Sequence, residues 1–122
     1  MDWKFTGSKP VYQQIMEHFR AAVLAGEYPP GGRGPSVREL AAEARVNPNT
    51  VQKVLALLEQ DGLVISNGTK GRFVTENTEV ISNIKLLLQT EYLQSVRESA
   101  ARLGITKQQF MQFLQESEDK DE

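Results

Sequence analysis

Residues 36–61, SVRELAAEARVNPNTVQKVLALLEQD, predict two short helices joined by a tight turn. Ser36 and Glu39 have the spacing of a capping box, in which the serine hydroxyl accepts from the Glu39 amide and the Glu39 carboxylate accepts from the Ser36 amide. The first helix is therefore expected to begin there and to end near Ala44. Asn47–Pro48 opens the second helix, because asparagine is a good N-cap and proline fits the first helical position.

The second helix, which Gly62 ends, has two chemically different faces. Its apolar residues follow the spacing i, i+3, i+4 and i+7 and are expected to pack inward: Val51, Val54, Leu55 and Leu58. The start of its outer face is polar: Asn47, Asn49, Thr50, Gln52 and Lys53. Asn and Gln can pair with adenine and Lys with guanine when a helix enters the major groove. The pattern favours a helix-turn-helix that reads DNA, although an ordinary solvated helix face is the alternative.

Two β-prone runs follow, Leu63–Ser66 and Gly71–Thr75, and the Asn67–Gly68 dipeptide between them predicts a tight hairpin turn. A hairpin directly after a helix-turn-helix is a wing, whose tip can follow phosphates or enter the minor groove. Ile65 and Phe73 are expected to pack inward. The residues at or near the tip are Asn67, Gly68, Lys70 and Arg72.

The region before these helices supplies a scaffold and a loop. A helix is expected to begin at Pro10 and to stop at Gly26. Its apolar residues recur at helical spacing: Val11, Ile15, Phe19, Ala22 and Val23. The segment 27–35 is rich in proline and glycine, so it is expected to be a loop, and it places Arg33 just ahead of the capping box.

Six motifs in this order resemble the winged helix-turn-helix of the GntR family of bacterial transcription regulators over roughly residues 10–75. They are Pro-Val-Tyr-Gln-Gln-Ile, Gly-Glu-Tyr-Pro-Pro-Gly, Pro-Ser-Val-Arg-Glu-Leu-Ala, Val-Asn-Pro-Asn-Thr-Val-Gln-Lys, Leu-Glu-Gln-Asp-Gly-Leu-Val and Gly-Thr-Lys-Gly-Arg-Phe-Val. The short C-terminal remainder resembles the YtrA-type subgroup. The resemblance implies a mainly α fold with a small β-hairpin wing, in which a winged helix-turn-helix domain precedes a C-terminal helical hairpin.

The resemblance also implies roles for individual residues. Arg38 is expected to contact phosphate or base, and Gly68 to lie at the wing tip in the minor groove. Four residues are expected to face DNA from the second helix: Asn47, Asn49, Thr50 and Gln52. Arg33, Lys53, Lys70 and Arg72 complete the predicted DNA-binding set. The family commonly has a large aliphatic residue where this chain has Gly34, so we expect a loose loop at 31–34, with Arg33 ordered only on DNA.

The length and composition exclude several other classes of protein. The chain has 122 residues, 39% of them apolar, which suits one small domain with an appendage. It has no cysteine, no apolar run near the roughly 20 residues that span a membrane, and a first segment unlike a signal peptide. His18 is the single histidine. We therefore predict a cytoplasmic protein that is not an enzyme and has no catalytic residues, metal site or cofactor.

The charge is the weakest part of the DNA hypothesis, although its distribution along the chain helps somewhat. The whole chain has a formal net charge of −2. Residues 1–77 contain nine basic and eight acidic residues, whereas residues 78–122 contain five and eight. Because nucleic-acid-binding domains are often strongly basic, a near-neutral first domain leaves open a winged-helix module that binds protein without specific DNA binding. Local charge near the outer face of the second helix can still be positive.

The C-terminal segment is predicted to form a dimer. Asn77 or Thr78 opens a long helix that ends at Gly104, and the capping box Thr106–Gln109 opens another. Their apolar residues cover more than one face, which leaves a surplus for a partner. We expect residues 1–77 to bind DNA and residues 78–122 to dimerise. The predicted interface residues are Ile84, Leu87, Leu88, Phe110, Met111, Phe113 and Leu114.

Such a homodimer would read an inverted-repeat operator whose half-sites are separated by about one helical turn or a simple multiple of it. A repressor is favoured over an activator because no surface is evidently dedicated to recruiting polymerase. Two alternatives remain open for the C-terminal segment. It could fold back on its own domain, or the stripe at 110–114 could line a cleft for an unidentified small-molecule effector. The acidic tail 116–122 is expected to be a frayed end.

Overall fold

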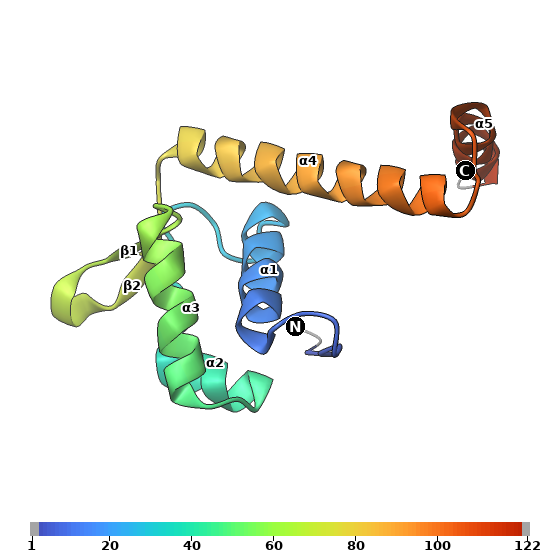
Figure 1. The fold of residues 1–122 in the computed structure, drawn as a ribbon. Coiled ribbons are helices and arrows are strands. Elements are labelled where there is room, and N and C mark those ends of the chain that lie inside the picture. Colours follow the sequence, from blue (N-terminus) through green and yellow to red (C-terminus); the bar gives the residue numbers. More distant parts are fainter. Residues whose placement is uncertain (1–2, 121–122) are drawn as a thin grey trace. The chain divides into compact units, whose positions relative to one another are not determined.

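The computed structural model describes residues 3–120 and shows a mainly helical chain with one β-hairpin (Figure 1). The elements in chain order are α1 (Val11–Leu24), α2 (Val37–Ala44), α3 (Pro48–Gln60), β1 (Val64–Ser66), the 3₁₀ turn η1 (Gly68–Lys70), β2 (Arg72–Val74), α4 (Thr78–Arg102) and α5 (Lys107–Lys120). They form two compact units, Met1–Asn83 and Ile84–Glu122, which are described separately. The predicted fold class is confirmed.

The caps of the helix-turn-helix are where the sequence predicts them. The Glu39 amide donates to Ser36 Oγ over 3.1 Å at the start of α2. The Asn49 amide donates to Asn47 Oδ1 over 2.8 Å at the start of α3, where Pro48 is the first helical residue. These bonds satisfy amides that have no partner within their own helix, so they fix where each helix begins.

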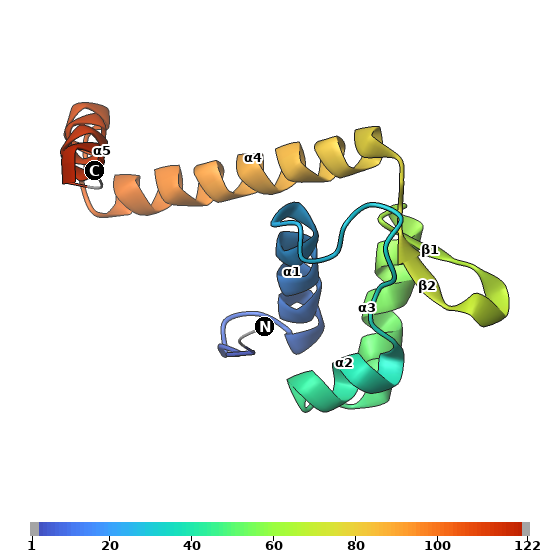
Figure 2. The same ribbon diagram turned by 180° about the vertical axis from the view of Figure 1, so that it is seen from behind.

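The core of the first unit lies between its three helices and the hairpin. α1 and the hairpin lie on opposite sides of α3 (Figures 1 and 2). The largest fully buried side chains are Phe19, Ile15, Leu40, Leu55, Leu58, Leu63, Val51, Val54 and Val74. The predicted inward stripe of α3 is therefore buried in full, and the polar residues on the other side of the helix are left facing outward.

The hairpin presents the opposite face to the core from the one predicted. Val64 pairs with Val74 and both are buried, whereas Ile65 pairs with Phe73, and Ile65 is 48% exposed. Side chains alternate along a strand, so the inward position of the two valines sends their neighbours outward. Leu63 is buried as well, because it ends the turn from α3 before the strand begins. Because Leu63 and Val64 are consecutive and both buried, the sequence does not show which residues of the strand alternate toward the core.

The wing tip is wider than the tight turn predicted from Asn67–Gly68. Five residues connect the strands, and the Asn67 amide donates to the Gly71 carbonyl over 2.9 Å to close the loop. Within it, the Lys70 amide donates to the Asn67 carbonyl, which makes one 3₁₀ turn. Gly71 has φ +105° and ψ −160°, a region that favours glycine, so the chain re-enters the hairpin there.

The glycine-rich loop is paired to the wing, so the expectation of a loose loop is wrong. The Gly34 amide donates to the Arg72 carbonyl over 2.9 Å, and the Gly31 amide to the Val74 carbonyl over 2.9 Å. The Val74 amide donates back to Gly32. These bonds add a short third segment to the edge of β2. Backbone hydrogen bonding therefore holds the loop at the position where the resembled family commonly has a large aliphatic residue.

The second unit contains most of α4 and all of α5. Gly104, with φ +71°, ends α4, and the predicted capping box is complete because Thr106 and Gln109 exchange two hydrogen bonds of 2.9 and 3.1 Å. α5 crosses the end of α4 (Figures 1 and 2). It continues through Lys120, so the frayed end predicted from residue 116 is not found there, while Asp121 and Glu122 lie outside the described residues.

None of the helices within residues 3–120 has both the length and the apolar character that crossing a membrane requires.

Candidate nucleic-acid interface

The start of α3 presents the polar face that the sequence predicts. Asn49, Gln52 and Lys53 are exposed and Thr50 is half-buried. Asn47 is also exposed, but its side-chain carbonyl oxygen accepts the capping hydrogen bond, so its amide group is the part left for an external acceptor. These side chains offer donors and acceptors of the kinds that base edges in the major groove recognise.

Two arginines of the helix-turn-helix add positive charge beside this face. Arg38, the second residue of α2, is exposed as predicted. Arg45 is exposed in the turn between α2 and α3 and adopts a left-handed conformation with φ +57°. Sequence reasoning missed Arg45, although its place two residues before the α3 cap was a usable signal. Left-handed backbone is uncommon outside glycine, Asn and Asp, so this turn holds Arg45 in a defined position.

Arg33 is carried on the same sheet as the wing. It forms an isolated bridge with Phe73 of β2, and its guanidinium lies 3.7 Å from the point where a Cβ on Gly71 would be. Arg33 is exposed, as are Gly68 and Lys70 at the tip. The pairing fixes the Arg33 backbone to β2 without DNA, which contradicts the expectation that DNA is needed to order it. Arg33 is therefore tied to the hairpin whose tip contains Gly68 and Lys70.

Arg72 has a different environment from the other predicted DNA contacts. Its Nε donates to Glu59 Oε1 of α3 over 2.8 Å, and both side chains are only about 30% exposed, at 29% and 32%. Glu59 thereby neutralises Arg72 and joins β2 to the end of the recognition helix α3. A similar pair, Arg20 with Asp61 at 2.5 Å, joins α1 to the end of α3. The two pairs brace the helix from both sides.

Replacing Gly71 with alanine is expected to lower the free energy of unfolding by about 1–3 kcal/mol, because its φ and ψ lie in a region essentially limited to glycine. The neighbouring space would accept a methyl group, so the cost comes from the backbone. Gly68→Ala is the matched control, since Gly68 has φ +52° and open space around it. Urea unfolding of both variants tests this. Equal destabilisation by the two would show that Gly71 is not specially required.

An acidic hollow lies on the α2 side of the Arg33 segment. It measures about 340 Å³ and is lined by Tyr28, Arg33, Gly34, Pro35, Glu39 and Glu43. Burial raises the pKa of the Tyr28 hydroxyl above its ordinary value, and the charges of Glu43, Glu27 and Glu39 raise it further. Tyr28 is therefore neutral at physiological pH. The carboxylates reduce the positive charge around Arg33, which limits how strongly a single unit can attract phosphate.

The family model described as "Bacterial regulatory proteins, gntR family" matches residues 11–74, from the start of α1 to the end of the wing. The chain belongs to the GntR family. It is a DNA-binding transcription regulator with a winged helix-turn-helix, and its relatives place it in the YtrA-type subgroup. The family is one of regulators and not of enzymes.

Two curated relatives of this GntR-family chain match it over nearly its whole length. The uncharacterised transcriptional regulator YhcF of Bacillus subtilis is 35% identical over 114 residues, which cover 93% of this chain and 94% of YhcF. The transcriptional repressor YtrA of the same species is 31% identical over 110 residues, which cover 89% of this chain and 85% of YtrA.

Solved structures of two regulators share this fold. A GntR family transcriptional regulator from Listeria monocytogenes is 28% identical, with a TM-score of 0.84 over 92% of this chain and 98% of that one. The DNA-binding domain of AraR in complex with operator ORX1 is 26% identical, with a TM-score of 0.57 over 62% of this chain and 96% of that domain.

In this GntR regulator, the residues predicted for dimerisation differ in exposure. Leu87, Met111, Phe113 and Leu114 are exposed, Leu88 and Phe110 are half-buried, and Ile84 is buried. Further large apolar side chains are exposed on the same two helices: Leu86, Tyr92, Leu93, Leu103 and Ile105. Most of the large exposed apolar side chains in the described part of the chain therefore lie on α4 and α5 or in the connection between them.

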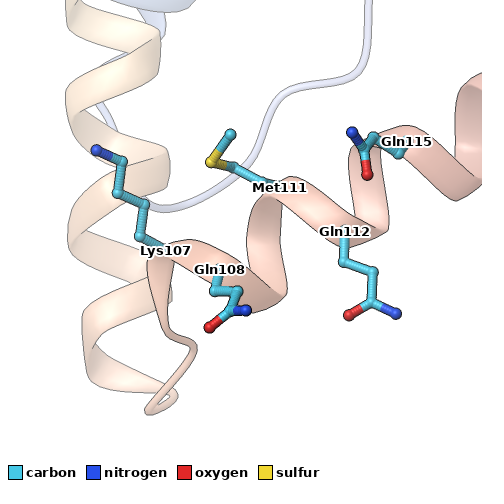
Figure 3. A pocket seen from close by; sticks show the side chains of 5 residues that line it. All are labelled: Lys107, Gln108, Met111, Gln112 and Gln115. Atoms are coloured by element: carbon cyan, nitrogen blue, oxygen red, sulfur yellow. The ribbon is translucent and has the colours of Figure 1, made fainter.

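The stripe at 110–114 does not line one common cleft. Met111 lines an open depression of about 590 Å³ on α5, where its neighbours are polar or charged (Figure 3). The other lining residues of this depression are Lys107, Gln108, Gln112 and Gln115. Phe110 instead lines a hollow of about 490 Å³ at the α4–α5 elbow, together with Leu93, Val96 and Ile105. The stripe is thus divided between two faces of α5.

Proposed function

We propose that this chain is a transcriptional repressor that binds an inverted-repeat operator as a homodimer. The observation that carries the proposal is the combination of one outward-facing recognition helix with a helical segment rich in exposed apolar residues. One helix-turn-helix covers a single half-site, so two copies related by a twofold axis are needed to read a palindrome. The name of the relative YtrA supports repression.

Within this proposal, the residues of the recognition helix read bases and the basic residues around it hold phosphates. The base-reading set is Asn47, Asn49, Thr50 and Gln52, and the phosphate set is Arg33, Arg38, Lys53 and Lys70, with Gly68 in the minor groove. We assign Arg72 a positioning role instead, because its guanidinium is engaged by Glu59 and holds the wing against α3. Arg45 joins the phosphate set on the basis of its exposed position.

The helices α4 and α5 supply the dimer interface. A single DNA-binding domain with a few phosphate contacts binds DNA weakly. Nonspecific binding has a dissociation constant of about 10⁻⁴ to 10⁻⁶ M at physiological salt. Burying the exposed leucines and aromatic residues of 84–114 against a second copy would stabilise a dimer and bring in a second DNA-binding domain. An effector that changes the geometry of this interface would change the distance between the two recognition helices. A regulator of chromosomal DNA also has to work in the cytoplasm.

The first test is binding of the full chain to a fluorescent DNA fragment from immediately upstream of its own coding region. The titration is made at two salt concentrations beside a scrambled fragment. Preference for the native fragment by 10³-fold or more, weakened by salt, is expected for an operator-specific regulator. Equal, weak binding to both fragments would contradict the operator proposed here and would favour a winged-helix module that binds protein.

Arg38→Ala and Gln52→Ala are each expected to reduce operator affinity by about 1–3 kcal/mol, or roughly five- to 150-fold, because each removes a direct contact to DNA. Gln60→Ala is the matched control, since Gln60 is an exposed glutamine at the far end of the same helix. Fluorescence anisotropy measures the affinities and thermal unfolding confirms that the variants fold. Unchanged affinity in both Arg38 and Gln52 variants would refute the assigned reading face.

A further inference from the structure

A tyrosine of α1 is in direct contact with a lysine of the recognition helix. Lys53 Nζ lies 3.9 Å from the centre of the Tyr12 ring, which is the geometry of a cation–π interaction. Tyr12 is in the first turn of α1 and is half-buried, whereas Lys53 is exposed in the second turn of α3. The two helices that carry these residues, α1 and α3, pack against each other.

We propose that Tyr12 is a positioning residue of the DNA interface, and that its ring holds the Lys53 ammonium at the edge of α3 for contact with a backbone phosphate. A lysine on a free stem has four flexible carbon–carbon bonds and loses side-chain entropy when it binds. A ring beneath the ammonium reduces that loss before DNA arrives. The inference rests on the proposed function, since it needs α3 to enter the groove.

The Tyr12–Lys53 pair lies on the side of α3 that has no cation from the wing. The wing lies on the opposite side of α3 from α1 (Figures 1 and 2). It carries Lys70 near its tip, and Arg33 is bridged to its strand β2. A recognition helix in the major groove is flanked by a phosphate backbone on each side. With Lys53 fixed at the α1 side, the DNA-binding domain has a cation on each side of α3. The two cations together define the orientation of α3 in the groove.

The sequence alone does not reveal this contact. Tyr12 and Lys53 are in different helices, and no local pattern joins them. The same side chains are each consistent with an ordinary solvated surface when taken singly. Their pairing gives Tyr12 a role in the DNA interface that the predicted set of binding residues does not contain.

A double-mutant cycle on operator affinity tests the proposal. Lys53→Ala is expected to weaken binding about tenfold and to reduce the slope of log affinity against log salt by about one. Tyr12→Leu keeps apolar bulk but has no ring, and is expected to weaken binding three- to fivefold. Tyr12→Phe keeps the ring and is expected to bind like the wild type. The double variant Tyr12→Leu with Lys53→Ala is expected to match Lys53→Ala alone.

Three outcomes would overturn the proposal. These are additive losses in the double variant, no loss in Tyr12→Leu, or an equal loss in Tyr12→Phe, which would indicate that the hydroxyl itself contacts DNA. Thermal unfolding of every variant separates these from a folding defect. Gln52→Ala distinguishes the two levels of inference. If it weakens operator binding while Tyr12→Leu does not, the positioning role alone is wrong, whereas a wild type without operator preference contradicts the proposed function.

Discussion

A glutamate in place of Leu87 or Phe113 is expected to convert the proposed dimer to a monomer and to lower operator affinity by roughly 10²- to 10⁴-fold. Leu87 is 49% exposed and Phe113 is 61% exposed, so both are available to a partner. An unpaired carboxylate within an apolar interface is strongly unfavourable. Two separate monomers also lose the high effective concentration that a dimer has for the second half-site once the first is bound. Light scattering measures the mass and fluorescence anisotropy measures the affinity.

Gln89→Glu is the matched control for this prediction, because it places the same charge on an exposed polar position of α4. It is expected to leave both mass and operator affinity close to the wild type. Circular dichroism establishes that the three variants retain their helices. A Leu87→Glu and a Phe113→Glu variant that both remain dimeric would show that the interface lies elsewhere than the predicted surface of 84–114.

The features that the sequence predicted correctly depend on spacing within one helix. The side chains of Ser36, Asn47 and Thr106 each accept the expected amide hydrogen bond, because the capping acceptor and the donor amide are only two or three residues apart. The inward stripe of α3 is buried because four apolar residues fall on one side of a 3.6-residue turn. Local chemistry is sufficient to place such elements.

The features that were missed depend on contacts between distant residues. Nothing near Gly34 indicates that its amide will donate to the Arg72 carbonyl, so the loop was expected to be loose. The hairpin was assigned the wrong inward face because Leu63 is buried immediately before Val64. A one-residue change in register moves every side chain of a strand to the other face, and only packing against the helices decides it.

At the candidate site too, contacts between distant residues could not be predicted from the sequence. Composition identified the polar start of α3 and most of the surrounding cations, since those residues need only be exposed. It could not distinguish Arg72 from Lys70, although one is engaged by Glu59 and the other is exposed at the tip. Ion pairs and cation–π contacts form across elements, so they became visible only once the helices were assembled.

Phe19→Ala is expected to lower the free energy of unfolding by about 3–5 kcal/mol. Phe19 is fully buried in the middle of α1, and its ring lies 5.1 Å from that of Tyr28. The substitution leaves a cavity and removes this ring contact. A unit of this size has a total stability of only about 4–12 kcal/mol, at 0.05–0.15 kcal/mol per residue. Urea unfolding followed by circular dichroism gives the difference.

Two further variants show whether the loss comes from the cavity. Phe19→Leu retains most of the apolar volume and is expected to cost less than Phe19→Ala. Gln13→Ala, at a half-buried polar position on the same helix, is expected to change stability by at most about 0.5 kcal/mol. If all three variants unfold alike, α1 is not part of the cooperative core. If the expected order holds, α1 stabilises the unit that positions α3, and operator binding should fall with the folded fraction.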